Sequence, residues 1–187
     1  MKDKNTDKAK KQASDRKRRF SSRRVAFTGV FACLALILGY VEYLIPFNFG
    51  IPGVRLGLAN LATVSVLYLY GEIPALSVSA VRIILSSVLF GNPVAFAYSL
   101  CGGMLSFAVM ALLKHTGKFG ITGVSIAGGT AHNIAQLAVA ALIFDNFRLA
   151  FYLPVLLISG AVTGLFIGLC SALLCSRIAK TGISGKN

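Results

Sequence analysis

The stretch S-I-A-G-G-T-A-H-N-I-A-Q, residues 125–136, lies in the middle of an apolar segment of residues 121–144. At helical spacing, four of its members fall at i, i+4, i+7 and i+11 and share one face: Ser125, Gly129, His132 and Gln136. Asn133 lies at the edge of that face. Such polar side chains are costly inside a membrane helix unless they face protein, water or a ligand. The pattern therefore predicts a helix with a polar face turned away from lipid.

Two interpretations fit this polar face. His132, Asn133 and Gln136 either join helices by hydrogen bonds beside a close glycine–glycine contact, or they face a bound ligand. We favour the ligand-facing surface, because a buried arginine, Arg82, accompanies the cluster in another apolar segment.

The composition predicts a membrane protein with a basic tail. Only 13% of the 187 residues are charged and 56% are hydrophobic, whereas a soluble domain has about 25% charged residues. Residues 1–24 hold 11 of the 19 Lys and Arg and 3 of the 6 Asp and Glu. Anionic lipid beside this tail explains the basic charge, and we expect no nucleic-acid partner.

The apolar segments predict an all-α integral membrane protein with six transmembrane helices. A spanning helix needs about 20 apolar residues, and about 17 at the least. The second segment is therefore short and the last is long. The six segments are residues 25–45, 56–70, 73–90, 94–113, 121–144 and 149–175.

The basic residues predict the orientation. With six spans, the tail of residues 1–24, the loop of residues 114–118 and the end at residues 177–180 lie on one side. The positive-inside rule makes that side cytoplasmic, in a bacterial cell membrane. We expect a disordered tail over residues 1–24, a transmembrane domain over residues 25–179 and a short cytoplasmic tail over residues 180–187.

Arg82 lies about nine residues from either end of its segment, with Ser79 and Ser86 on the same helical face. A central arginine costs about 2.5–3.5 kcal/mol on translocon scales, so it must face a partner or a cavity. Glu42, near the outer end of the first segment, is the acidic residue nearest at hand. A structural Glu42–Arg82 pair is thus the alternative to a ligand site.

The outer connection of residues 46–55 carries two prolines, two glycines and two phenylalanines. Phe47 and Phe49 are candidates for a lid over the site, the alternative being an ordinary turn. Arg55 is placed to meet an anionic group, and Asn60 lies about one turn further in.

Small residues four apart predict close helix packing. The first segment pairs Gly29 with Cys33 and carries Ala32 beside them. The last segment has a ridge of glycines at Gly160, Gly164 and Gly168. We expect both sets to pack on another helix, in this chain or in a partner.

The residues required for catalysis are missing after the tail. Glu42, Glu72 and Asp145 are the three acidic residues there, and they are far apart in the sequence. No two carboxylates are spaced to work as acid and base or to hold Mg²⁺ at a diphosphate. We therefore expect no catalytic residues, no metal site and no cofactor.

Three motifs resemble a bacterial family known under two labels. They are P-G-V-R-L-G-L-A-N-L at 52–61, V-R-I-I-L-S at 81–86 and G-G-T-A-H-N-I-A-Q-L at 128–137. The labels are "heptaprenyl diphosphate synthase component I" and "Gx transporter family", and the resemblance covers roughly residues 25–179.

The transporter label implies similarity to the substrate-binding S components of energy-coupling-factor importers. Such a resemblance implies a six-helix bundle with both termini inside, an outer lid, and a small-residue motif in helix one that engages a transmembrane coupling protein driven by ATPases. The synthase label implies a non-catalytic partner of a soluble prenyl-elongating subunit.

We favour the importer: a subunit that binds a small anionic or hydrogen-bonding solute, as a vitamin or a precursor would be. The alternative is a non-catalytic membrane subunit of a heptaprenyl diphosphate synthase in isoprenoid or menaquinone metabolism. The residues assigned to solute binding are Glu42, Arg55, Asn60, Arg82, His132, Asn133 and Gln136.

Overall fold

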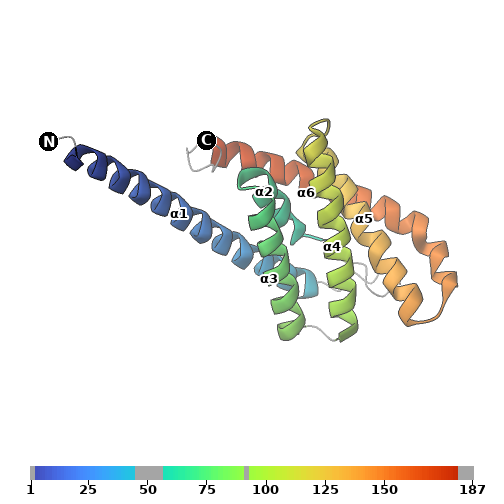
Figure 1. Cartoon of the computed structure of the whole chain (residues 1–187). Helices are drawn as coiled ribbons and strands as arrows, with labels where there is room; N and C mark the ends of the chain where they lie inside the picture. The colour runs from blue at the N-terminus through green and yellow to red at the C-terminus, as the bar shows by residue number, and fades with distance from the viewer. Residues whose placement is uncertain (1–2, 45–56, 91–92, 181–187) are drawn as a thin grey trace.

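The computed structural model describes residues 3–44, 57–90 and 93–180, and these residues form helices without a strand. The prediction of an all-α membrane bundle is confirmed. The elements in chain order (Figure 1) are α1 (Asp3–Leu44), α2 (Asn60–Leu69), α3 (Glu72–Phe90), α4 (Pro93–Thr116), α5 (Ile121–Ile143), the 3₁₀ helix η1 (Phe147–Tyr152) and α6 (Leu153–Lys180).

The second predicted span is shorter than expected. α2 has 10 residues, or about 15 Å at 1.5 Å per residue, which is half of a hydrocarbon core of about 30 Å. Its start is delayed by a turn at Gly57, where φ is +72° and the carbonyl accepts a hydrogen bond from the Asn60 N–H at 2.8 Å. In the described part of the chain, five helices, α2 excepted, are long and apolar enough to span a membrane.

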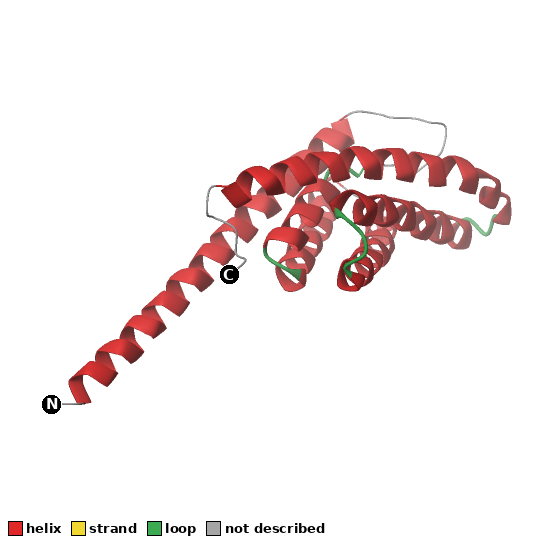
Figure 2. Cartoon of the chain, turned by 90° about the horizontal axis from the view of Figure 1, so that it is seen from above, coloured by secondary structure: helices red, strands yellow, loops and turns green. Residues whose placement is uncertain are grey.

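α1 begins at Asp3, so residues 3–24 continue the helix of the first span where the sequence predicts disorder. Lysine, arginine, alanine and glutamine, which make up much of this segment, are good helix formers. The helix extends well beyond the rest of the bundle (Figures 1 and 2). Both ends of the chain and the α4–α5 connection lie on the same side of the molecule in Figure 1.

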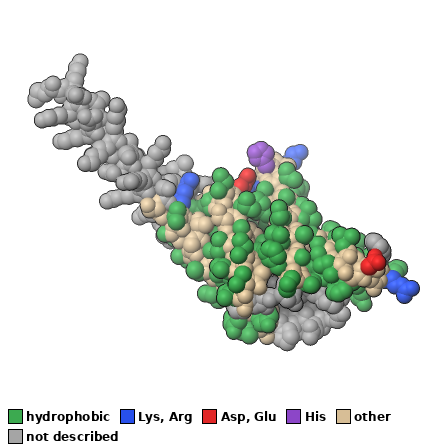
Figure 3. All heavy atoms as spheres, turned by 60° about the horizontal axis from the view of Figure 1, so that its bottom comes forward, with side chains coloured by type: hydrophobic (Ala, Val, Ile, Leu, Met, Phe, Trp, Pro, Cys, Tyr) green, Lys and Arg blue, Asp and Glu red, His purple; other side chains and the backbone are tan. Residues whose placement is uncertain are grey.

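The outside of the bundle is apolar. In Figure 3, hydrophobic side chains cover the visible face between charged side chains at its two ends. Large apolar side chains on five of the α-helices are more than half exposed, among them Val30, Val88, Leu112, Leu142 and Leu173. A water-exposed surface rarely carries so large an apolar area. The chain is a multi-pass membrane protein whose outer face meets lipid.

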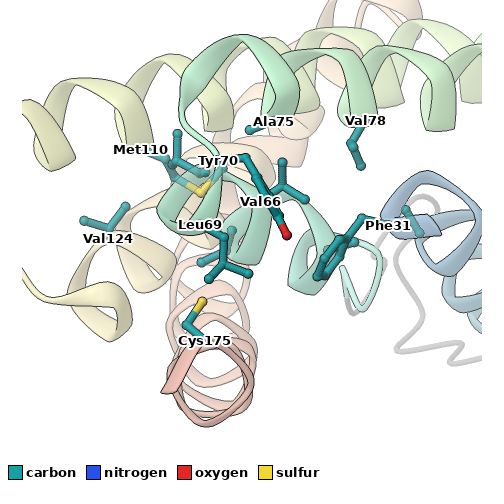
Figure 4. Packing of buried hydrophobic residues seen from close by; sticks show 13 residues of the cluster. Phe31, Val66, Leu69, Tyr70, Ala75, Val78, Met110, Val124 and Cys175 are labelled. Atoms are coloured by element: carbon teal, nitrogen blue, oxygen red, sulfur yellow. The ribbon is translucent and has the colours of Figure 1, made fainter. Parts of the chain in front are cut away.

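α2 is the centre of the core. Val64, Val66 and Leu67 of this helix are at most 1% exposed. Each of the other five α-helices contributes to the same cluster (Figure 4), through Phe31, Val78, Met110, Val124 and Cys175. Because Asn60 and Leu69 at the two ends of α2 are buried, this short helix does not leave its terminal backbone groups facing lipid.

The end of α2 is held by a lysine from α4. Nζ of Lys114 donates a hydrogen bond of 2.7 Å to the carbonyl of Leu67 and lies 5.8 Å from the ring centre of Tyr68. A cation at the last turn of a helix satisfies a free carbonyl and complements the helix dipole.

Replacing Lys114 with methionine is expected to lower the free energy of unfolding by about 1 kcal/mol, since a helix-end cation and a cation–π contact contribute about that much together. Thermal unfolding in mild detergent measures the loss. Lys118→Met is the matched control, because Lys118 is an exposed lysine in the turn after α4. Equal unfolding temperatures for the two variants would contradict this role for Lys114.

Candidate functional site

The polar residues predicted to face inward are buried. Asn60, Arg82, His132, Asn133 and Gln136 are each 3–8% exposed, although they lie in three different helices. Burial alone does not place these side chains in one site, so their contacts decide which of them lie together.

His132 and Gln136 pack against α4 at a glycine. A side-chain carbon built onto Gly102 would lie 2.8 Å from Cε1 of His132 and 3.1 Å from Cγ of Gln136. Any larger residue at Gly102 would displace the imidazole ring. This contact fixes the part of the polar face that carries His132 and Gln136 against α4 at Gly102.

The other end of the same face packs against α6. Carbons built onto Gly160, Gly164 and Gly168 would come within 2.7–2.9 Å of α5 atoms, among them the carbonyl of Ser125. The predicted glycine ridge thus packs on a helix of its own chain. α5 and α6 come close along their lengths because none of these positions carries a side chain.

Asn133 joins α5 to α6 directly. Its Nδ2 donates a hydrogen bond of 2.9 Å to the carbonyl of Leu156, and the side chain is 3% exposed. This is the interhelical bond that the alternative interpretation of the polar face describes. For Asn133, packing and hydrogen bonding account for its burial.

A small cavity lies where the start of α2 meets α5 and α6. Its lining includes Asn60, Ser125, His132, Asn133 and Thr163, and its volume is about 10 Å³. That volume holds about one water molecule, whereas ligand pockets measure about 300–1,000 Å³. The fold therefore brings together three of the residues assigned to solute binding, around a space of the size of a water.

Arg82 is buried in α3, on the same side of the helix as Ser79 and Ser86. Ser86 Oγ would be 3.7 Å from a carbon built onto Gly39 of α1, and Ser79 Oγ would be 3.8 Å from one built onto Gly103 of α4. Arg82 shares the helical face of these two serines. It does not line the cavity described above.

Glu42 contacts the turn that precedes α2. One of its carboxylate oxygens accepts a hydrogen bond from the backbone N–H of Gly57. Glu42 therefore helps to fix the point at which the chain enters α2. The predicted lid residues Phe47 and Phe49, and the cation Arg55, lie outside the described residues.

The first helix leaves part of its small-residue face uncovered. Gly29 and Ala32 line a groove of about 470 Å³ between α1 and α3, and Cys33 is exposed. Arg24 and Ser77 also line this groove, and neither was selected from the sequence. Small residues at 29, 32 and 77 were the available signal, but nothing in the sequence pairs the first segment with the third.

Among the described residues, no three His, Cys, Asp or Glu side chains are grouped to hold a metal ion. Glu42 lies near the end of α1, Glu72 begins α3 and Asp145 follows α5. The arrangement offers helix packing, a water-sized polar cavity and a large apolar groove.

No curated protein and no solved structure matches this chain. The family model described as heptaprenyl diphosphate synthase component I matches residues 31–174, which is more than three quarters of the sequence. The matched range runs from Phe31 of α1 to Leu174 of α6 and so includes most of the packed bundle. The chain belongs to the heptaprenyl diphosphate synthase component I family.

Proposed function

We propose that this chain is the non-catalytic membrane subunit of a heptaprenyl diphosphate synthase, working with a separate prenyl-elongating subunit. The observation that carries the proposal is the family match across residues 31–174, in a bundle that has an apolar outer surface. Chain elongation on a diphosphate uses Mg²⁺ held by carboxylates. With three dispersed acidic residues after the tail, that chemistry belongs on the partner.

The interior geometry supports this assignment over solute import. Asn133 is engaged with the Leu156 carbonyl, and His132 packs on Gly102. The polar cavity beside them has a volume of about 10 Å³, far below the range of about 300–1,000 Å³ for ligand pockets. A larger hollow, lined mainly by apolar side chains, lies at the surface between α1 and α3.

The synthase subunit has a clear physical task in this proposal. A prenyl chain becomes less soluble in water with each added unit, because each buried CH₂ contributes about 0.8 kcal/mol in favour of an apolar environment. A membrane subunit that keeps the elongating enzyme at the bilayer gives the growing chain a short route into lipid. The basic tail places positive charge at that surface.

The test is affinity purification of the tagged full chain from its native membrane in mild detergent, followed by mass spectrometry. We expect a soluble prenyl synthase to co-purify, and prenyl-transfer activity to appear in the purified complex. An untagged strain controls for carry-over. Recovery of a transmembrane coupling protein with ATPases, without a synthase, would overturn the proposal.

A second candidate is the substrate-binding subunit of an importer. The observation in its favour is that Asn60, His132 and Asn133 line one cavity at the start of a helix that begins inside the bundle. Transporters commonly place solutes at the ends of such broken helices. Importer partners in the purification, together with solute uptake that His132→Ala abolishes, would establish this candidate instead.

A further inference from the structure

The described residues of α1 and α3 leave a groove between the two helices that helix packing does not explain. The two helices approach each other at Gly39 and Ser86, where a carbon built onto the glycine would lie 3.7 Å from the serine oxygen. Toward the end of the bundle that carries Arg24 they leave a space of about 470 Å³. This volume lies within the range of ligand pockets, about 300–1,000 Å³.

The groove presents hydrocarbon to its occupant. Its walls carry Val25, Ala32, Ile73 and Val81, and a carbon built onto Gly29 would meet nothing within 4 Å. The occupant must therefore be apolar over most of its length.

The two hydroxyls in the lining do not change this character. Thr28 Oγ1 donates a hydrogen bond of 2.7 Å to the carbonyl of Arg24, and Ser77 Oγ donates one of 3.0 Å to the carbonyl of Ile73. Both hydroxyl protons are thus taken by the residues' own helices, one turn back. Neither proton is offered to a ligand, so a polar peptide or sugar has little to bind there.

One end of the groove carries a positive charge. Among the described residues that line the groove, Arg24 carries the charge, and it is exposed. A guanidinium is suited to phosphate, because its planar fork can donate two parallel hydrogen bonds. An apolar channel with an arginine at one end fits an amphiphile that has an anionic head.

We propose that this groove binds a polyprenyl diphosphate, with the prenyl chain between α1 and α3 and the diphosphate at Arg24. The proposal rests on the proposed function, which supplies such a molecule as the product of the partner subunit. A groove bounded by two helices has room for one chain and suits a one-tailed amphiphile better than a two-tailed phospholipid. A transmembrane helix of a partner would match the apolar walls of the groove but not the positive charge at its end.

Contacts between α1 and the core hold the groove in its position. The ring of Phe27 on α1 stacks on Tyr70 at the end of α2, with ring centres 5.9 Å apart. Phe27, Phe31 and Val78 also belong to the core or pack against it. These contacts fix α1 against the bundle on the inner side and leave its outer side beside α3 open to lipid.

The experiment is photolabelling of the purified full chain in phosphatidylcholine nanodiscs, with a diazirine-bearing geranylgeranyl diphosphate as the probe. We expect labelled peptides from residues 24–32 and 73–81, and displacement of the probe by unlabelled geranylgeranyl diphosphate. Gly29→Leu, which fills the groove, and Arg24→Gln, which removes the cation, should each reduce labelling at least about tenfold, or 1.4 kcal/mol in binding.

Two variants serve as matched controls. Gly120→Leu adds the same side chain at another glycine with nothing within 4 Å, in the turn before α5. Arg148→Gln removes an exposed arginine from η1, away from the groove. Both should label as the unaltered protein does.

The outcomes separate the competing occupants. Displacement by phosphatidylglycerol as efficiently as by geranylgeranyl diphosphate would identify a phospholipid site and overturn the proposal. Labelling outside the groove would overturn it too. If Gly29→Leu keeps its label but loses co-purifying proteins, the groove receives a partner helix and the proposal is wrong.

Failure of the proposed function has a different signature. In that case no synthase co-purifies with the unaltered chain, whereas the probe still labels the groove and Gly29→Leu still blocks it. If instead the synthase co-purifies equally with the unaltered chain and with Gly29→Leu, and the probe labels neither, the groove proposal alone has failed.

Discussion

Replacing Gly164 with leucine is expected to force α5 and α6 apart and to lower the free energy of unfolding by about 3 kcal/mol, the upper end of the usual cost of overpacking. A side-chain carbon at this position would lie 2.7 Å from Cα of Ile126 and 2.8 Å from the carbonyl oxygen of Ser125. Both are backbone atoms of a helix, so neither can turn aside as a flexible side chain can.

The structure supplies a contrast within the same bundle. A carbon built onto Gly128 would lie 2.5 Å from Cγ of Met110 and 2.6 Å from its sulfur. Methionine has several rotatable bonds and adapts to a changed space. Gly128→Ala should therefore cost less than Gly164→Ala, although the built carbon approaches its neighbour more closely at Gly128.

Thermal unfolding of the Gly164→Leu variant in mild detergent measures the loss. Gly29→Leu is the matched control, because a side chain there meets nothing within 4 Å and both glycines lie inside long helices. The control should unfold at the temperature of the unaltered protein or slightly above it, since leucine is the better helix former. Comparable unfolding of the two variants would show that α5 and α6 are not packed through this ridge.

The glycine ridge also shows what a sequence can and cannot reveal about such a fold. Glycines at intervals of four predict a close helix contact, and that contact exists. Which helix lies opposite is a property of the whole bundle, because α1 also carries small residues at the right spacing. Gly164 is covered by α5, whereas Gly29 borders an open groove.

Hydropathy predicts five of the six spans, because a lipid-facing helix needs a long apolar segment. α2 departs from this rule because it is covered by protein. Residues 56–70 are mostly apolar, so their composition does not distinguish a short buried helix from a crossing one. The turn at Gly57, with φ at +72°, sets the difference.

The polar residues were predictable as buried, because lipid excludes them, but their neighbours were not. His132 and Asn133 are adjacent in sequence, yet the first packs on Gly102 of α4 and the second bonds to Leu156 of α6. Glu42 accepts a hydrogen bond from the backbone N–H of Gly57, a contact that the sequence did not indicate, and a Glu42–Arg82 pair stays a prediction. Solute binding by these residues stays a prediction.

Replacing Leu67 with alanine is expected to lower the free energy of unfolding by about 2–3 kcal/mol. Of the side chains that the structure describes, Leu67 is the largest that is fully buried, and it lies in α2 at the centre of the core. In a membrane protein the unfolded chain keeps its apolar side chains in lipid, so the transfer term is small and packing dominates. The cavity left by the lost atoms supplies the cost, at about 24 cal/mol per Å³.

Leu112→Ala separates this packing effect from the chemistry of the substitution. Leu112 lies in α4 and is 69% exposed. Its side chain contacts lipid in both the folded and the unfolded state, so its removal changes little protein packing. It should change stability by less than about 0.5 kcal/mol, as surface substitutions do. The hydrogen bond from Lys114 to the backbone carbonyl of Leu67 survives in Leu67→Ala, so the difference between the two alanine variants reports the side chain alone.

Similar unfolding of both variants would mean that α2 does not pack as the centre of the bundle. A helix of 10 residues is too short to span the membrane and depends on that packing for its place in the bundle.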